Sequence, residues 1–94
     1  MDSEKLIERK LVEGVKARGG ICVKFYSAYQ RGVPDRIILM PGGRIFFVEL
    51  KSTGKKPTKL QMLFIGKLQD LGFEVAVIDT IEGLNNFFRT KIDV

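Results

Sequence analysis

The fold of this sequence is decided by residues 36–51, which read RIILMPGGRIFFVELK. Two apolar runs rich in β-branched and aromatic residues flank Pro41-Gly42-Gly43, a combination typical of a tight turn. We therefore expect strands over residues 36–40 and 44–50, joined as a hairpin. The second run is apolar on both faces of its alternation, which is typical of a central strand covered on both sides.

The flanking sequence adds alternating helices and strands. Gly19-Gly20 and Gly72 are suited to end helices, and Thr58 and Thr80 are suited to begin them. The order αβββαβα predicts an α/β fold with a mixed four-stranded sheet flanked by helices. The remaining elements are expected to be helices over residues 3–18, 58–71 and 80–89, and strands over residues 21–26 and 74–78.

Length and composition indicate one small globular domain, residues 1–94. The chain is 45% hydrophobic and 29% charged, and no apolar run is long enough to cross a membrane. The absence of histidine excludes histidine-based catalysis and HExxH metal sites, and the single Cys22 excludes an internal disulfide. Since no signal-peptide pattern is present, we expect a protein of the reducing cytoplasm.

The charge balance favours a polyanionic partner. Sixteen Lys and Arg residues against eleven Asp and Glu residues give a net charge of +5. Neutralising phosphates releases counterions, so nucleic acid is a better expected partner than a membrane.

Two glutamates lie on the apolar side of the first expected helix. Glu4 and Glu8 share a stripe with Leu11 and Val15 when successive residues advance by 100°. A buried carboxylate must be paired, hydrogen-bonded or metal-bound. A place in the first helical turn, where negative charge is favourable, is enough to explain a carboxylate at Glu4. It explains the carboxylate at Glu8 less well.

A second group of charged residues gathers at the end of the hairpin. Alternation puts Glu49 and Lys51 on the same face as Phe47, where the expected central strand ends. A turn at residues 41–43 places Asp35 opposite residues near Glu49 and Lys51. A simple surface ion pair between Glu49 and Lys51 is the alternative interpretation.

These residues are suited to phosphoryl chemistry. Asp35, Glu49 and Glu8 offer only hard oxygen ligands, which suit Mg²⁺ or Mn²⁺. A divalent ion activates water without histidine, and Lys51 beside it would act on that water or stabilise transition-state charge.

The motifs resemble a known family. Gly32-Val33-Pro34-Asp35, then Phe47-Val48-Glu49-Leu50-Lys51, then Gln61 resemble the PD-(D/E)XK nuclease superfamily and its VRR-NUC branch, over nearly the whole chain. The resemblance implies a restriction-endonuclease-like αβββαβ core. It also implies a structure-selective endonuclease of bacteria or phages that cleaves four-way (Holliday) junctions as a homodimer.

The resemblance also assigns roles to single residues. Asp35, Glu49 and the backbone carbonyl of Leu50 would bind the metal ion, and Lys51 would be the catalytic lysine. Glu8 would complete the metal site, with Glu4 one turn away as the alternative. Gln61 would position water or substrate, or else form a capping box with Thr58.

The sequence leaves other functions open. They are a non-catalytic nucleic-acid-binding module on a nuclease scaffold, a subunit that needs a partner chain, and a nickase or flap nuclease. The presence of Asp35, Glu49 and Lys51 argues against the non-catalytic module.

Several surface residues complete the expectations. Tyr26 and Tyr29 are expected to pack in the ordinary way, with stacking on an unpaired base as the alternative. Phe87 and Phe88 exceed what a terminal helix covered on one face needs, which predicts a partner surface and supports a homodimer. The expected DNA contacts are Lys24, Arg31, Arg36, Lys55, Lys56 and Lys59.

Overall fold

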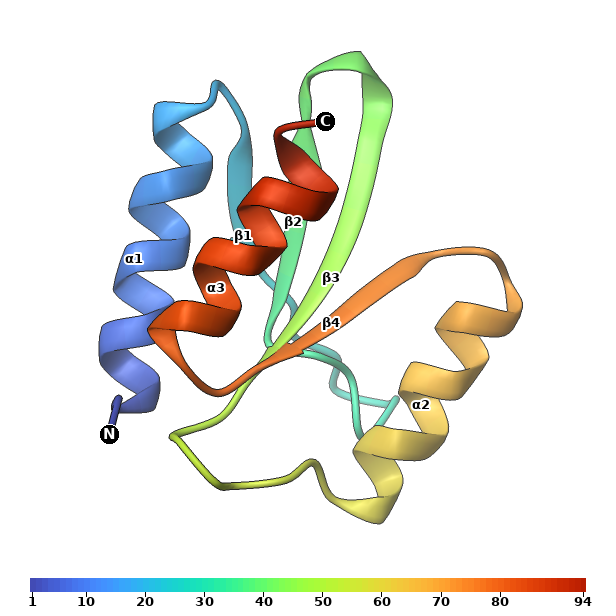
Figure 1. Cartoon of the computed structure of the whole chain (residues 1–94). Coiled ribbons are helices and arrows are strands. Elements are labelled where there is room, and N and C mark those ends of the chain that lie inside the picture. Colours follow the sequence, from blue (N-terminus) through green and yellow to red (C-terminus); the bar gives the residue numbers. More distant parts are fainter.

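A mixed four-stranded sheet lies at the centre of the computed structural model, which describes residues 1–94 (Figure 1). Helices α1 and α3 cover one face of this sheet, and α2 lies on the other side. The elements are α1 (Glu4–Ala17), β1 (Ile21–Lys24), β2 (Arg36–Met40), the short 3₁₀ turn η1 (Pro41–Gly43), β3 (Arg44–Leu50), α2 (Lys59–Asp70), β4 (Glu74–Ile78), α3 (Ile81–Phe87) and the π-helical turn η2 (Phe88–Ile92).

The sheet confirms the predicted mixed four-stranded architecture. The strand order is β1-β2-β3-β4; β2 is antiparallel to both β1 and β3, and β4 is parallel to β3. The predicted hairpin turns through η1, where Gly42 and Gly43 have φ angles of 82° and 74° that glycine adopts without strain. Strand β3 is central, and its residues 46–50 are all buried, as its two-sided apolar pattern predicted.

The main core lies between the sheet and α1 with α3. Phe46, Val48 and Leu50 of β3 belong to it, together with Ile7 and Leu11 of α1. These two helical residues are four apart, as expected for one buried face of a helix, and both are fully buried. Since side chains alternate along a strand, Phe47, Glu49 and Lys51 lie on the opposite face of the sheet from this core.

The prediction that Phe87 and Phe88 form a partner surface is wrong. Their exposed fractions are 5% and 6%, and the ring of Phe87 packs edge-on against Phe46 at 5.8 Å. Phe88 lies under the Arg18 guanidinium, 4.0 Å from its ring centre. The reason is that the last helix contacts both the sheet and α1, so two of its sides are covered.

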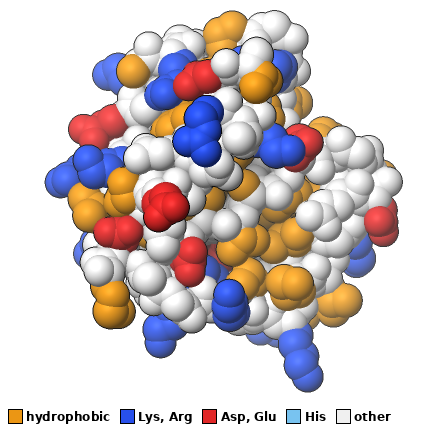
Figure 2. Space-filling model, viewed as in Figure 1, with side chains coloured by type: hydrophobic (Ala, Val, Ile, Leu, Met, Phe, Trp, Pro, Cys, Tyr) orange, Lys and Arg blue, Asp and Glu red, His pale blue; other side chains and the backbone are white.

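The other face of the sheet is only partly covered. Phe47 contacts Phe25 at 5.8 Å and Phe73 at 5.4 Å, and Phe64 of α2 closes over Phe25. Beyond this cluster, neighbouring apolar residues of three strands stay accessible: Ile21, Leu39 and Ile45 are 62%, 38% and 40% exposed. Hydrophobic side chains also reach the surface over β4 and α2 (Figure 2).

The first strand is shorter than expected and leads into a long loop. Regular pairing ends at Lys24, although the amide of Phe25 still donates to the carbonyl of Asp35 at 2.9 Å. No helix of this structure combines the length and apolar content needed to span a membrane.

Candidate functional site

Asp35 is held at the point where β2 begins. It follows the buried Pro34, and its Oδ2 accepts a hydrogen bond of 2.7 Å from the backbone amide of Leu50. Arg36 pairs with Val48, so continuing the register by one residue places Asp35 opposite Glu49. Directly opposed residues share a face of the sheet, which brings these two carboxylates together.

The same register leaves the carbonyl of Leu50 without a backbone donor on β2. In a strand, the amide and carbonyl of one residue point toward the same neighbour. Since the Leu50 amide donates to Asp35, its carbonyl also points to the β2 side. The residue opposite Leu50 is Pro34, which has no amide hydrogen to donate. Leu50 therefore presents a carbonyl oxygen without a ladder donor beside Asp35.

Glu49 is the one buried charged residue of the chain. It is 1% exposed, and its Oε1 has no hydrogen-bond partner. Burial, and after it the nearby charge of Asp35, raise the pKa of this carboxyl group to about 7 against the lowering effect of Lys51. A buried carboxylate oxygen without a partner is costly, so this oxygen is suited to accept a cation.

Lys51 is positioned beside Glu49 by the end of β3. Its Nζ lies 3.2 Å from Glu49 Oε2, and its side chain is 18% exposed. The Lys51 amide donates to the carbonyl of Ile78, which keeps the chain next to β4 one residue beyond the strand. The ammonium group is thus both close to the carboxylate pair and reachable from solvent.

A network from the N-terminus holds the loop that follows Lys51. Thr53 Oγ1 accepts from the amide of Asp2 at 2.8 Å and donates to the carbonyl of Asp79 at 2.8 Å. Asp79 Oδ2 accepts from the amide of Gly54, and Asp2 Oδ2 caps α3 through the amide of Ile81. Sequence reasoning missed this network because its members are far apart in the chain and are common surface residue types.

Glu8 and Arg36 form an ion pair. Arg36 Nε donates to Glu8 Oε2 at 2.9 Å, and Arg36 Nη1 donates to the carbonyl of Cys22 at 3.3 Å. The Arg36 side chain is 13% exposed, so this expected DNA contact is largely occupied inside the protein. By contrast, the charge of the exposed Glu4 acts on Glu49 and helps to raise its pKa.

Gln61 forms the expected capping box. Its Oε1 accepts from the amide of Thr58 at 2.8 Å, while its own amide donates to Thr58 Oγ1. The cap occupies the side-chain oxygen of Gln61 and leaves the Nε2 hydrogens free for another partner. Capping and substrate positioning are therefore compatible.

Gly32 has a packing role that depends on a distant part of the chain. Its φ of +82° is in the left-handed region, and a Cβ atom there would collide with the backbone carbonyl group of Leu60, whose carbon lies 2.7 Å from that position. The loop of residues 25–34 thus docks on the first turn of α2, next to Gln61. The motif contains Gly32, but nothing in its neighbouring residues indicates what the missing side chain makes room for.

Apart from Arg36, the basic residues expected to contact DNA are exposed. Lys and Arg side chains project from the lower edge of the molecule, where the loop between β3 and α2 runs (Figure 2). The exposed members of the expected DNA-binding set are Lys24, Arg31, Lys55, Lys56 and Lys59. None of these five is in an ion pair.

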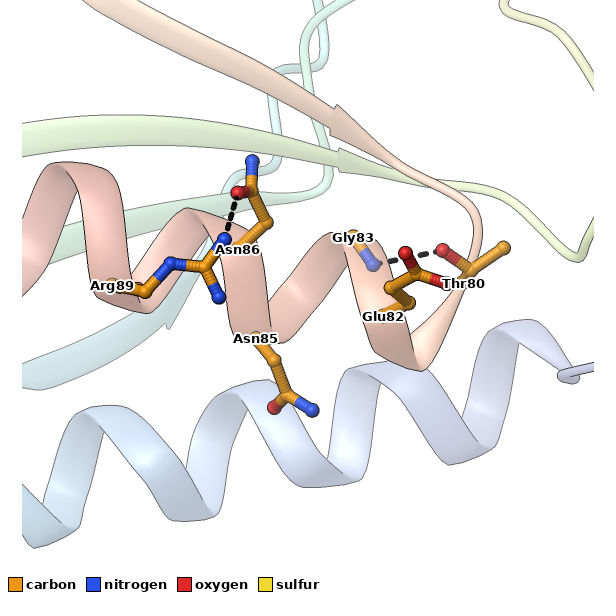
Figure 3. Close-up of a pocket in the computed structure, with 6 residues that line it drawn as sticks. All are labelled: Thr80, Glu82, Gly83, Asn85, Asn86 and Arg89. Atoms are coloured by element: carbon orange, nitrogen blue, oxygen red, sulfur yellow. Dashed lines mark hydrogen bonds between the residues drawn. The ribbon is translucent and has the colours of Figure 1, made fainter.

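A polar depression on α3 is separate from these residues. It is lined by Thr80, Glu82, Gly83, Asn85, Asn86 and Arg89 (Figure 3). Within it, Arg89 donates to Asn86 Oδ1 at 2.7 Å and the amide of Gly83 donates to Thr80 Oγ1. It contains none of the predicted site residues.

The arrangement fits a hard divalent cation that keeps much of its water. No group of three or more His, Cys, Asp or Glu side chains forms a metal cage. Asp35 and Glu49 instead supply two carboxylates beside the Leu50 carbonyl, and one Glu49 oxygen lacks a partner. Mg²⁺ typically uses one or two carboxylates and retains several waters, which matches this donor set.

Fold and site together define an α/β domain with a carboxylate pair and a lysine at adjoining strand ends. A family model described as "VRR-NUC domain" matches residues 3–80 of the chain. The chain therefore belongs to the VRR-NUC family, as its motifs predicted.

Two individual proteins are similar to it. "Putative nuclease p44" of Acyrthosiphon pisum secondary endosymbiont phage 1 is 47% identical over 77 residues, which cover 82% of this chain and 83% of that protein. A solved structure described as "VRR_NUC domain" superposes with a TM-score of 0.90 at 24% identity, covering 97% of this chain and 99% of that one. The second similarity confirms the fold.

Proposed function

We propose that this protein is a divalent-metal-dependent endodeoxyribonuclease that hydrolyses phosphodiesters in branched DNA, with four-way junctions as its preferred substrate. Membership of the VRR-NUC family and the 47% identical relative that is named as a nuclease support nucleic-acid cleavage. The observation that carries the proposal is the buried Glu49 carboxylate, which lies opposite Asp35 and leaves one oxygen unpartnered.

Each residue of the site has a distinct task in this reaction. Asp35, Glu49 and the Leu50 carbonyl would bind Mg²⁺ or Mn²⁺. The bound cation supplies Lewis-acid activation of water and of a phosphoryl oxygen. Lys51 holds the attacking water or donates to the phosphate oxygens, where negative charge develops. The water oxygen forms a bond to phosphorus while the bond to the leaving sugar oxygen breaks; solvent takes up the proton that the attacking water loses, and solvent supplies the proton that the leaving sugar oxygen gains.

Gln61 and a helix-borne glutamate would complete the site. The free Nε2 of Gln61 donates to water or phosphate. Glu8 is paired with Arg36, while the charge of Glu4 raises the pKa of Glu49. Glu8 stays the expected residue to assist the carboxylate pair, with Glu4 as the alternative. Comparing metal affinity of Glu4→Gln and Glu8→Gln decides between them, because only the glutamate that assists the metal weakens binding when neutralised.

We further propose that the enzyme acts as a homodimer. Paired cuts across a junction need two sites in a fixed relation, which a two-fold axis provides. Phe87 and Phe88 do not support this assembly, since both are buried. Light scattering tests it: a mass near twice 10.6 kDa is expected, and a monomer that makes paired symmetric cuts would refute it.

The proposed activity is tested with a panel of labelled DNAs. Four-way junction, flap, duplex and single strand are incubated with the protein in Mg²⁺, in Mn²⁺ and in chelator. We expect metal-dependent cleavage that is fastest on the junction. Faster cutting of the flap would transfer the assignment to a flap nuclease, and tight binding without cutting in either metal would indicate a non-catalytic module.

A further inference from the structure

The loop between β1 and β2 exposes two aromatic side chains. Tyr26 is 85% exposed and Tyr29 is 99% exposed, and neither makes a side-chain hydrogen bond or a ring contact with the rest of the chain. The expectation that they pack in the ordinary way is therefore wrong. The most exposed phenylalanine, Phe73, is only 38% exposed, so these two tyrosines are the exceptional aromatic residues of this protein.

This loop is fixed at both ends. Phe25, just before Tyr26, donates to the Asp35 carbonyl and packs its ring between Phe47 and Phe64. At the other end, Gly32 lies against the backbone of Leu60. The loop thus runs from the sheet to the first turn of α2 (Figure 1).

The segment between these anchors also has internal order. The amide of Gln30 donates to Ser27 Oγ at 3.0 Å, and the Gln30 side chain donates to the carbonyl of Arg31. Tyr26 and Tyr29 therefore project from a braced turn. Exposing two large rings in fixed positions has a hydrophobic cost unless something covers them in function.

The charge of this loop and its position next to Asp35 indicate which kind of ligand covers the two tyrosines. Between Lys24 and Pro34 the chain has Lys24 and Arg31, both exposed, and no acidic residue. The loop ends at Asp35, a member of the proposed metal site. A ligand that reaches this loop is thus expected to be anionic, to lie next to the scissile phosphate and to offer flat apolar surfaces. Nucleobases of unpaired DNA have these properties, because every unstacked base offers a π face.

We propose that Tyr26 and Tyr29 form a stacking platform for unpaired bases beside the cleavage site, which favours branched DNA with bases opened at the branch, and single strands, over an intact duplex. This inference rests on the proposed function, because it assumes that DNA is bound at Asp35 and Glu49. It goes further by naming the residues that distinguish unpaired from paired DNA. Paired bases within a duplex are already stacked and do not offer a face to these rings.

The test measures binding in chelator, where no cleavage occurs. The ligands are a short single strand with a central 2-aminopurine and the blunt duplex of the same sequence. We compare the wild type with the Tyr26→Ala/Tyr29→Ala protein and, as matched control, the Tyr26→Phe/Tyr29→Phe protein. Neither tyrosine packs against the core, so both variants should keep the wild-type melting temperature.

The alanine variant is expected to bind the single strand roughly 5- to 100-fold more weakly, with unchanged duplex affinity. The 2-aminopurine fluorescence should be quenched by the wild type and the phenylalanine variant, and not by the alanine variant. Equal loss on single strand and duplex, or no loss on either, would overturn the platform. This result can be told apart from a failure of the proposed function. If the tyrosines are needed for single-strand binding but no metal-dependent cleavage is found, only the cleavage is refuted. If the protein cleaves DNA but neither binding nor cleavage changes in the alanine variant, only the platform is refuted.

Discussion

Asp35 Oδ2 accepts a 2.7 Å hydrogen bond from the backbone amide of Leu50. The bond lies at the end of the β2–β3 hairpin, opposite the turn. Pro34 has no amide hydrogen to continue the backbone hydrogen bonds there, and the Asp35 side chain pairs with β3 instead. It fixes one Asp35 oxygen, while Asp35 Oδ1, the Leu50 carbonyl and the Glu49 carboxylate remain as the candidate ligands of a cation. The same bond therefore stabilises the hairpin and orients the candidate ligands.

Neutralising either carboxylate should abolish cleavage. Asp35→Asn and Glu49→Gln each remove a negative charge from the proposed metal site, so cleavage should fall more than roughly 100-fold, the usual upper effect of losing an outer-shell partner. DNA binding should persist or tighten. The control is Asp70→Asn at the exposed end of α2. Metal-dependent cutting by either site variant at the control's rate would contradict the assignment.

The buried Glu49 carboxyl should make stability depend on pH when no metal is present. Its pKa rises from 4.5 to about 7 on folding, so the native state binds the proton more tightly than the unfolded state. The contribution of this group to stability is then greatest below pH 4.5, falls as the pH rises toward 7, and is level above that. The total loss is on the order of 3 kcal/mol or less.

Urea unfolding in chelator at several pH values measures this dependence. Glu49→Gln should flatten it and raise stability at about pH 8, above the folded-state pKa, whereas the exposed Glu13→Gln should leave it unchanged. Added Mg²⁺ should restore part of the loss in the wild type, because a cation favours the ionised carboxylate. A Glu49→Gln protein with the wild-type pH profile would show that this carboxyl group is not the cause.

Lys51→Ala should separate catalysis from metal binding. The lysine contacts Glu49 Oε2 at 3.2 Å but is no ligand, so turnover should fall roughly 100- to 10,000-fold while calorimetry still detects the metal. Lys67→Ala, an exposed lysine of α2, is the matched control. If metal affinity fell as steeply as in Asp35→Asn, Lys51 would be needed for the metal site itself.

The lysines of the β3–α2 loop and of the start of α2 should determine the salt dependence of binding. Changing Lys55, Lys56 and Lys59 to glutamine should weaken binding to all DNA shapes alike and lower the log–log salt slope on duplex by roughly 2.7. The control changes three exposed lysines of α1 instead, Lys5, Lys10 and Lys16, which removes the same charge. An equal decrease in slope for both triple variants would show a diffuse charge effect and no specific contact.

Gly32→Ala should destabilise the protein more than Gly54→Ala. Both glycines have positive φ, of 82° and 88°, so both changes strain the backbone by about 1–2 kcal/mol. Only at Gly32 does the new Cβ also collide with the backbone of Leu60, while Gly54 has nothing within 4 Å. The difference between the two unfolding free energies isolates the docking of the loop on α2. Equal values would mean that this contact contributes nothing.

The sequence alone determined the elements, their order and the main residues of the candidate site. Residues 36–51 show this most clearly, because a side-chain period of two, a glycine turn and a two-sided apolar run are local features. The hairpin register follows from the position of the turn, so local pattern is enough to place Asp35 and Glu49 together. The capping box of Thr58 and Gln61 is likewise a local pattern.

Only the tertiary structure decided what surrounds those residues. The sequence pattern puts Phe87 and Phe88 on the surface, but they are buried because the last helix packs against both the sheet and α1. The periodicity of that helix alone does not predict these contacts. Arg36 is a plausible DNA contact by its charge, but it pairs with Glu8 across two elements that are 28 residues apart. Tyr26 and Tyr29 are exposed because their loop is anchored to the core only at its two ends. Burial and pairing depend on which distant surfaces meet, and that is set when the whole chain packs.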